Sequence, residues 1–150
     1  MNLPLHHRDH VAGLDYAFFG RGTVVVRTDR ALLAHGTFRS LLGHLERDLV
    51  ERGLSLVQGA YYLPHVSTLP NPLDIASAAV SFVHRHPQMR AVCLVGPQQG
   101  LLRVVVEALA RSLPSFTVRF LREPAEALPV LRPREPDLPA NWIDLAKPLE

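Results

Sequence analysis

Apolar residues recur at helical spacing in the first half of the chain. They stand at positions i, i+3, i+4, i+7 and i+11, where the residues are Phe38, Leu41, Leu42, Leu45 and Leu49. This spacing places all five on one face of an α-helix. Charged residues occupy the intervening positions, so the helix is expected to pack on a core with one face only. Gly53 predicts the end of this helix, because glycine readily takes the left-handed conformation that closes a helix.

A second helix is predicted from Asn71 to Arg85. Asn71 is a suitable N-cap, and Pro72 fits the first helical position, where the missing N–H has no partner to lose. The segment is apolar on most sides, with a narrow polar stripe, so we expect protein to cover most of its surface. Pro87 predicts where it ends.

The strand predictions come from runs of apolar and β-branched residues. The unbroken run Ala91 to Val95 is typical of a strand that is buried on both faces in a parallel sheet. A β-hairpin is predicted from Leu14 to Phe19 and Thr23 to Arg27, because the short glycine-rich link Gly20-Arg21-Gly22 joins the two runs. Further strands are expected at 54–63 and 116–120, and further helices at 101–113 and 125–131. The sequence therefore predicts an α/β fold with a mixed, mostly parallel five-stranded sheet, an opening hairpin and about four helices.

Both ends of the chain differ in composition from the middle. Residues 1–13 are expected to form a flexible arm, whose three histidines and one aspartate we interpret as an adventitious metal binder rather than a metal site. Residues 132–150 are rich in proline and are expected to lack regular structure. Three apolar residues of this tail are candidates for an interaction segment: Trp142, Ile143 and Leu145. The tail is expected either to pack on its own domain, which would comprise residues 14–131, or to bind a neighbouring subunit.

Composition narrows the classes of function. The 150 residues suit one domain, and the net charge of +2 without a basic run gives no support for nucleic-acid binding. The single cysteine, Cys93, lies in a predicted buried strand and is expected to be an inert thiol. No apolar run is long enough to cross a membrane and no signal-peptide pattern is present, so a cytoplasmic protein is expected. We predict no cofactor and no metal site.

Polar residues follow two of the predicted strands. The first group is His65, Ser67, Thr68 and Asn71, and the second is Gly96, Gln98, Gln99 and Gly100. Ligands of open α/β folds bind at the carboxyl ends of strands, so these loops are the candidate ligand site or phosphorylated loop. The alternative is that both loops are ordinary connections whose polar side chains satisfy the local backbone.

The order of elements and four short segments resemble the STAS domain, which is named for sulphate transporters and anti-sigma-factor antagonists. The resemblance covers roughly Leu14 to Leu131. Its segments are His84-Arg85-His86-Pro87, Leu94-Val95-Gly96-Pro97, Arg119-Phe120 and Pro124-Ala125-Glu126-Ala127-Leu128. The resemblance implies a binding or interaction domain more strongly than an enzyme.

In that family a partner kinase phosphorylates a Ser or Thr within an Asp-Ser-Ser/Thr-Gly motif. The matching region here reads Ser67-Thr68-Leu69-Pro70-Asn71-Pro72-Leu73-Asp74 and lacks the adjacent Asp and Gly. Ser67 and Thr68 are therefore candidates by position only. We expect a non-catalytic regulatory or protein-interaction module that binds a protein partner or a second copy of itself. A small-ligand binder that uses loops 64–71 and 96–100 is the alternative.

Overall fold

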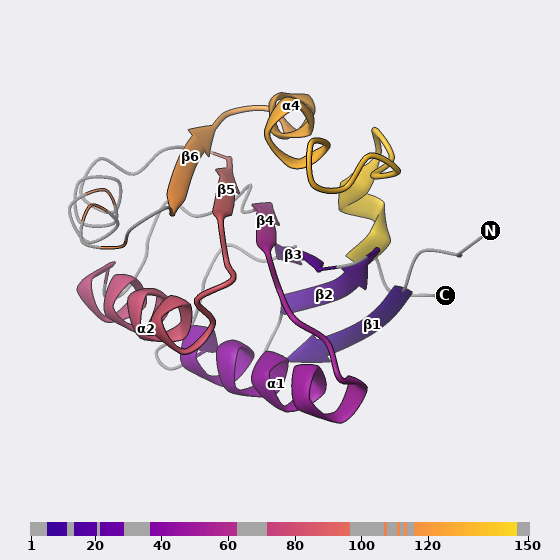
Figure 1. The fold of residues 1–150 in the computed structure, drawn as a ribbon. Helices are drawn as coiled ribbons and strands as arrows, with labels where there is room; N and C mark the ends of the chain where they lie inside the picture. The colour runs from indigo at the N-terminus through magenta and orange to yellow at the C-terminus, as the bar shows by residue number, and fades with distance from the viewer. Residues whose placement is uncertain are drawn as a thin grey trace.

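One six-stranded sheet forms the centre of the molecule (Figure 1). The computed structural model describes residues 6–11, 14–20, 22–28, 37–62, 72–96, 107, 111, 113 and 116–146. The strands lie in the sheet in the same order as in the sequence. They are β1 (His6–Val11), β2 (Leu14–Phe19), β3 (Thr23–Thr28), β4 (Gln58–Tyr62), β5 (Ala91–Val95) and β6 (Thr117–Leu121).

The sheet is mixed, as the sequence predicts. β2 pairs antiparallel with both β1 and β3, whereas β3, β4, β5 and β6 are parallel to one another. The hairpin of β2 and β3 turns at Gly20, whose φ of 62° lies in the left-handed region that favours glycine. β4 begins four residues later than predicted, because 54–57 does not pair with the neighbouring strands of the sheet.

The sheet has one strand more than the sequence analysis predicts. Residues 6–11, assigned there to a flexible arm, pair with β2 along their whole length, from His6 opposite Phe19 to Val11 opposite Leu14. The arm prediction was wrong for this segment. Its polar sequence carries no apolar alternation, but an edge strand gains its order from main-chain hydrogen bonds to one neighbour, and charged residues are common at such edges.

Two long helices cover one face of the sheet. They are α1 (Thr37–Arg52) and α2 (Pro72–Arg85), and both match the predicted helices closely (Figure 1). Gly53 has a φ of 64° and ends α1, as predicted. The guanidinium of Arg85 joins the helices by donating to Glu46, with its Nε 2.8 Å from Oε1. The helix predicted at 101–113 falls mostly outside the described residues.

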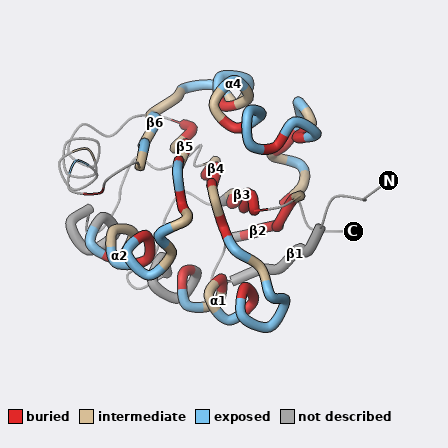
Figure 2. The backbone as a smooth tube through the Cα atoms, viewed as in Figure 1, coloured by how far each residue is buried: buried red, intermediate tan, exposed pale blue. Residues whose placement is uncertain are grey.

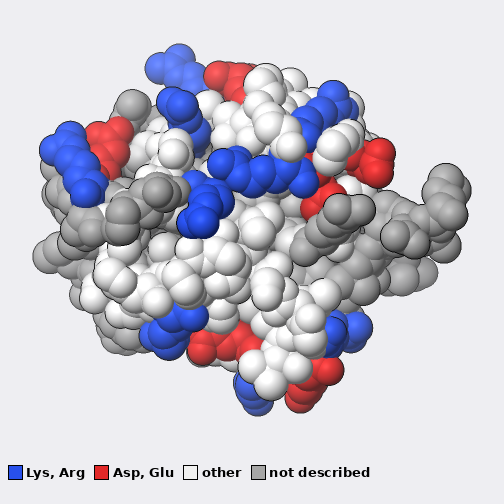
Figure 3. Space-filling view, in the orientation of Figure 1, with Lys and Arg blue, Asp and Glu red and all other residues white. Residues whose placement is uncertain are grey.

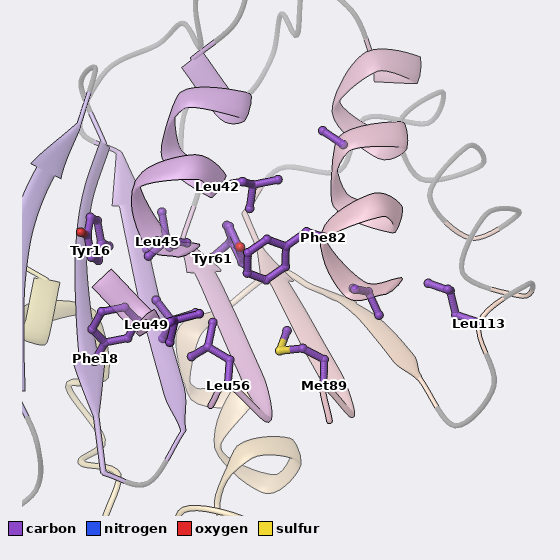
Figure 4. Close-up of a cluster of buried hydrophobic side chains, with 14 residues drawn as sticks. Tyr16, Phe18, Leu42, Leu45, Leu49, Leu56, Tyr61, Phe82, Met89 and Leu113 are labelled. Carbon is purple, nitrogen blue, oxygen red and sulfur yellow. The ribbon is translucent and has the colours of Figure 1, made fainter. Parts of the chain in front are cut away.

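The larger hydrophobic core fills the space between these helices and the sheet (Figure 4). Three of the leucines predicted to line the inner face of α1 are buried: Leu42, Leu45 and Leu49. They meet every second residue of β2 and β3, because alternate side chains of a strand point to the same face. The buried members from the strands and α2 include Tyr16, Phe18, Val24, Val26, Tyr61 and Phe82.

The C-terminal segment covers the opposite face. It contains the short helices η1 (Pro124–Ala127), α4 (Leu128–Leu131) and η2 (Trp142–Ala146). η1 begins at a capping box formed by Glu123 and Glu126, at the predicted position. Figure 2 shows buried positions on the strands and on the inner side of this segment. Strands β2 to β5 are therefore buried between two layers. η2 adds regular structure where the proline-rich sequence predicts none.

Candidate functional site

The two predicted loops begin side by side. β4 ends at Tyr62 and β5 ends at Val95, and these residues are register partners in adjacent parallel strands. The segments that follow both strands therefore leave the same edge of the sheet, where α/β folds bind ligands. The candidates His65, Ser67, Thr68, Asn71, Gln98, Gln99 and Gly100 lie outside the described residues.

Gly96 is the one candidate of these loops that the structure describes. It is buried, its φ is 142°, and its N–H donates to the carbonyl of Leu121 at 3.0 Å. L-residues rarely take this backbone conformation, so the position requires glycine. This requirement explains Gly96 by backbone geometry, without a role in ligand binding.

Trp142 of the candidate interaction segment lies in the core of its own chain. Its side chain has no exposed surface, and its indole Nε1 donates to the carbonyl of Pro124 at 2.9 Å. Ala17, Ala60 and Cys93 belong to the same buried cluster, and their small side chains leave room for the indole. Trp142 is therefore unavailable to a partner while the segment is docked.

The neighbours of Trp142 belong to the same contact. Ile143 and Leu145 are half-buried and pack against the cluster that contains Trp142. Figure 1 shows their segment lying beside β1, β2 and β3. Of the two dispositions expected for the tail, packing on its own domain is the one the structure shows for 132–146.

The Cys93 thiol and the Tyr61 phenol are buried and not activated. Burial raises the pKa of the Cys93 thiol to about 11, while the charge of Arg119 acts in the opposite direction. Burial also raises the pKa of Tyr61. A reactive thiol or phenol needs a lowered pKa and access to substrate, and neither group has them. Among the described residues, no three His, Cys, Asp or Glu side chains gather in a way that could hold a metal ion.

A buried polar network joins the hairpin to the C-terminal segment. The amide of Gln58 donates to the hydroxyl of Thr23 at 2.9 Å and to the carbonyl of Leu131 at 3.0 Å. The Thr23 hydroxyl in turn donates to the carboxylate of Glu135 at 3.0 Å. The carboxylate also lies against Gly20. The sequence analysis missed this network, and three polar residues far apart in the sequence gave no signal for it.

A second buried polar group lies between β2 and α1. The Tyr16 hydroxyl donates to the carboxylate of Asp48, and the Nε2 of His44 lies 3.9 Å from the same carboxylate. The Tyr16 and His44 rings meet edge to face, with centroids 5.9 Å apart. Because Tyr16 is fully buried, the arrangement anchors α1 on the sheet rather than presenting a catalytic group. The i, i+4 spacing of His44 and Asp48 was the available sequence signal.

The comparisons with known proteins give a structural relative. No family model and no curated protein sequence matches the chain. A crystal structure of an uncharacterised protein from Shewanella loihica PV-4 matches it with a TM-score of 0.51 and 16% sequence identity. That protein is assigned to the DUF3478 family and described as having a SpoIIAA-like fold. The match covers 87% of this chain and 97% of the other.

The fold is STAS-like. This confirms the resemblance inferred from the sequence, and the low identity makes the chain a divergent example of the fold. The STAS-like fold does not by itself define an activity, because one fold supports many functions. Within the described residues, no helix is both long and apolar enough to span a membrane.

Proposed function

We propose that this STAS-like chain is a non-catalytic module that acts by binding a protein through the segments at the carboxyl ends of β4 and β5. The main support is the register of Tyr62 with Val95, which starts both segments at one edge of the sheet.

The burial of the side chains that could act in catalysis also supports this proposal. Cys93 and Tyr61 are buried with raised pKa values, and Tyr16, Thr23 and Gln58 are fully buried in hydrogen-bonded contacts between elements. These groups stabilise the fold, so none of them is available for catalysis or recognition.

A capture experiment with matched variants tests this function. The full chain is immobilised and exposed to an extract of the cells that produce it, alongside Ser67→Ala/Thr68→Ala and Gln98→Ala/Gln99→Ala. The control is Ser77→Ala/Ser81→Ala, which removes two exposed serines from α2. We expect a protein that is retained by the wild type and the control and is lost from at least one edge variant.

Two results contradict the proposal. One is a set of retained proteins that is identical for the wild type and both edge variants. The other is loss of the same protein from the α2 control, which would move the binding surface to the helical layer. Far-UV circular dichroism of each variant shows whether a lost interaction comes from a lost fold.

A small-molecule site at the same edge is the second candidate. The same register of Tyr62 and Val95 favours it, because open α/β folds bind small ligands where adjacent strands end. It predicts that a ligand is retained with the chain, whereas the protein-binding function does not. A mass measurement separates the two.

A further inference from the structure

Four exposed arginines stand on the C-terminal layer of the molecule. Arg119 lies in β6 and Arg122 follows that strand, while Arg132 and Arg134 follow α4. We call these four residues the arginine patch. Figure 3 shows basic side chains gathered over β5, β6 and α4 on the face it presents.

The strand register places Arg119 on the same side of the sheet as α4. Arg119 is the register partner of Cys93, and directly opposite residues of neighbouring strands point to the same face. Cys93 belongs to the buried cluster beneath α4, together with Leu131, which immediately precedes Arg132. The influence of the Arg119 charge on the Cys93 thiol agrees with this placement. The two halves of the patch therefore flank one contact, that of α4 with β5.

The arginines of the patch have no carboxylate partner within the described part of the chain. Two acidic side chains of the same layer, Glu126 and Glu135, are engaged in other contacts, whereas Asp137 and Asp144 are exposed. The Glu126 carboxylate accepts from the main-chain N–H of Glu123 at 2.9 Å, in the capping box of η1. Glu135 is turned inward and accepts from Thr23. The Nε of Arg132 donates to the carbonyl of Leu138 at 3.1 Å. The donors available to another molecule are therefore the terminal nitrogens of Arg132 and the guanidinium groups of the other three arginines.

The surroundings of the patch indicate the chemistry of the molecule that would bind there. Guanidinium groups bind carboxylates through two parallel hydrogen bonds. Half-buried Leu128 and Val130 lie in α4, between the two pairs of arginines in the sequence, and add apolar surface. The net charge of +2 is small, and the chain has no basic run of the kind that follows a nucleic-acid backbone. We propose that the arginine patch binds an acidic segment of a protein partner.

This inference rests on the proposed function and adds to it the chemistry of the partner. The edge segments after β4 and β5 would provide one contact, and the arginine patch would provide the charge-dependent one. Charge complementarity of this kind mainly sets the association rate and the choice of partner.

Binding of a short fluorescent oligoglutamate peptide to the full chain tests the patch. The peptide is titrated at low salt and followed by fluorescence anisotropy. Arg119→Glu/Arg134→Glu is compared with Arg47→Glu/Arg52→Glu, which makes the same charge change at exposed positions of α1. We expect the patch variant to bind about tenfold more weakly than the wild type, and the control to stay within about threefold.

Three results would overturn the inference. They are no binding of the peptide by the wild type, equal weakening by both variants, and tighter binding of a single-stranded oligonucleotide of the same charge. Equal weakening would show a response to net charge alone, and preference for the oligonucleotide would assign the patch to nucleic acid. If these results occur while protein capture still depends on the edge segments, the arginine patch fails and the proposed function remains.

Discussion

Replacing Trp142 with alanine is expected to lower the free energy of unfolding by about 3 to 5 kcal/mol, the cost of removing a fully buried large aromatic side chain. The indole lies in the cluster between η2 and the sheet, with no exposed surface. Its loss leaves a cavity and removes the hydrogen bond to the Pro124 carbonyl. Among single substitutions in the C-terminal segment, this one is expected to have the largest effect.

Urea unfolding followed by far-UV circular dichroism measures this effect. Fluorescence is unsuitable for the comparison, because Trp142 is the only tryptophan in the chain. Asp144→Ala is the control, since Asp144 is an exposed residue of the same short helix and its loss should change stability by about 0.5 kcal/mol or less. Trp142→Phe keeps part of the packing and should fall between the two. An effect of Trp142→Ala no larger than that of the control would show that 132–146 does not depend on this contact.

Replacing Gly20 with alanine is expected to be nearly as damaging, by about 2 to 5 kcal/mol, from two separate causes. The φ of 62° is unfavourable for any residue with a Cβ. A Cβ at this position would also lie under 3.0 Å from the Glu135 carboxylate. That carboxylate would have to move and give up its buried hydrogen bond with Thr23.

A matched glycine separates the two causes. Gly53 has a φ of 64°, but nothing lies within 4 Å of the Cβ that alanine would add. Gly53→Ala should therefore cost only the conformational part, about 1 to 2 kcal/mol. In a Glu135→Ala background, Gly20→Ala should cost no more than Gly53→Ala, which corresponds to a coupling of at least about 1 kcal/mol. Equal costs at the two glycines in the wild-type background would show that Glu135 does not pack on the hairpin.

The elements that the sequence predicts well are those with a strong apolar period. The leucines of α1 follow the helical repeat closely, and Ala91 to Val95 form an unbroken apolar run, so both elements lie where the sequence analysis places them. The hairpin was equally clear, because glycines flank its turn. In each case the feature that determines the structure is local in the sequence.

The elements that were missed depend on contacts between distant residues. β1 has a polar sequence, and only its pairing with β2 makes it a strand. The contact of Glu135 with Thr23 joins residues more than a hundred positions apart, and no local sequence pattern predicts it. For Trp142, the sequence left open which surface it meets, because the small residues Ala17 and Ala60 become a pocket only after the sheet forms.

The candidate site was predictable only in its location. The sequence places polar residues after two strands, and the structure adds that these strands are adjacent, parallel and in register at their ends. The chemistry of recognition depends on the side chains of 63–71 and 97–100, for which no sequence pattern gives a known ligand. Gly96, included among the candidates, has a backbone explanation instead.

Native mass spectrometry of the full chain, purified without nickel, tests the central claim most directly. A protein-binding module is predicted to appear at the mass of the chain, 16.7 kDa, or at a multiple of it, with no small molecule retained. A non-protein mass that remains bound in a fixed ratio after dialysis, and that is lost on replacing Ser67, Thr68, Gln98 or Gln99, would contradict the claim. The edge of the sheet would then be a small-ligand site.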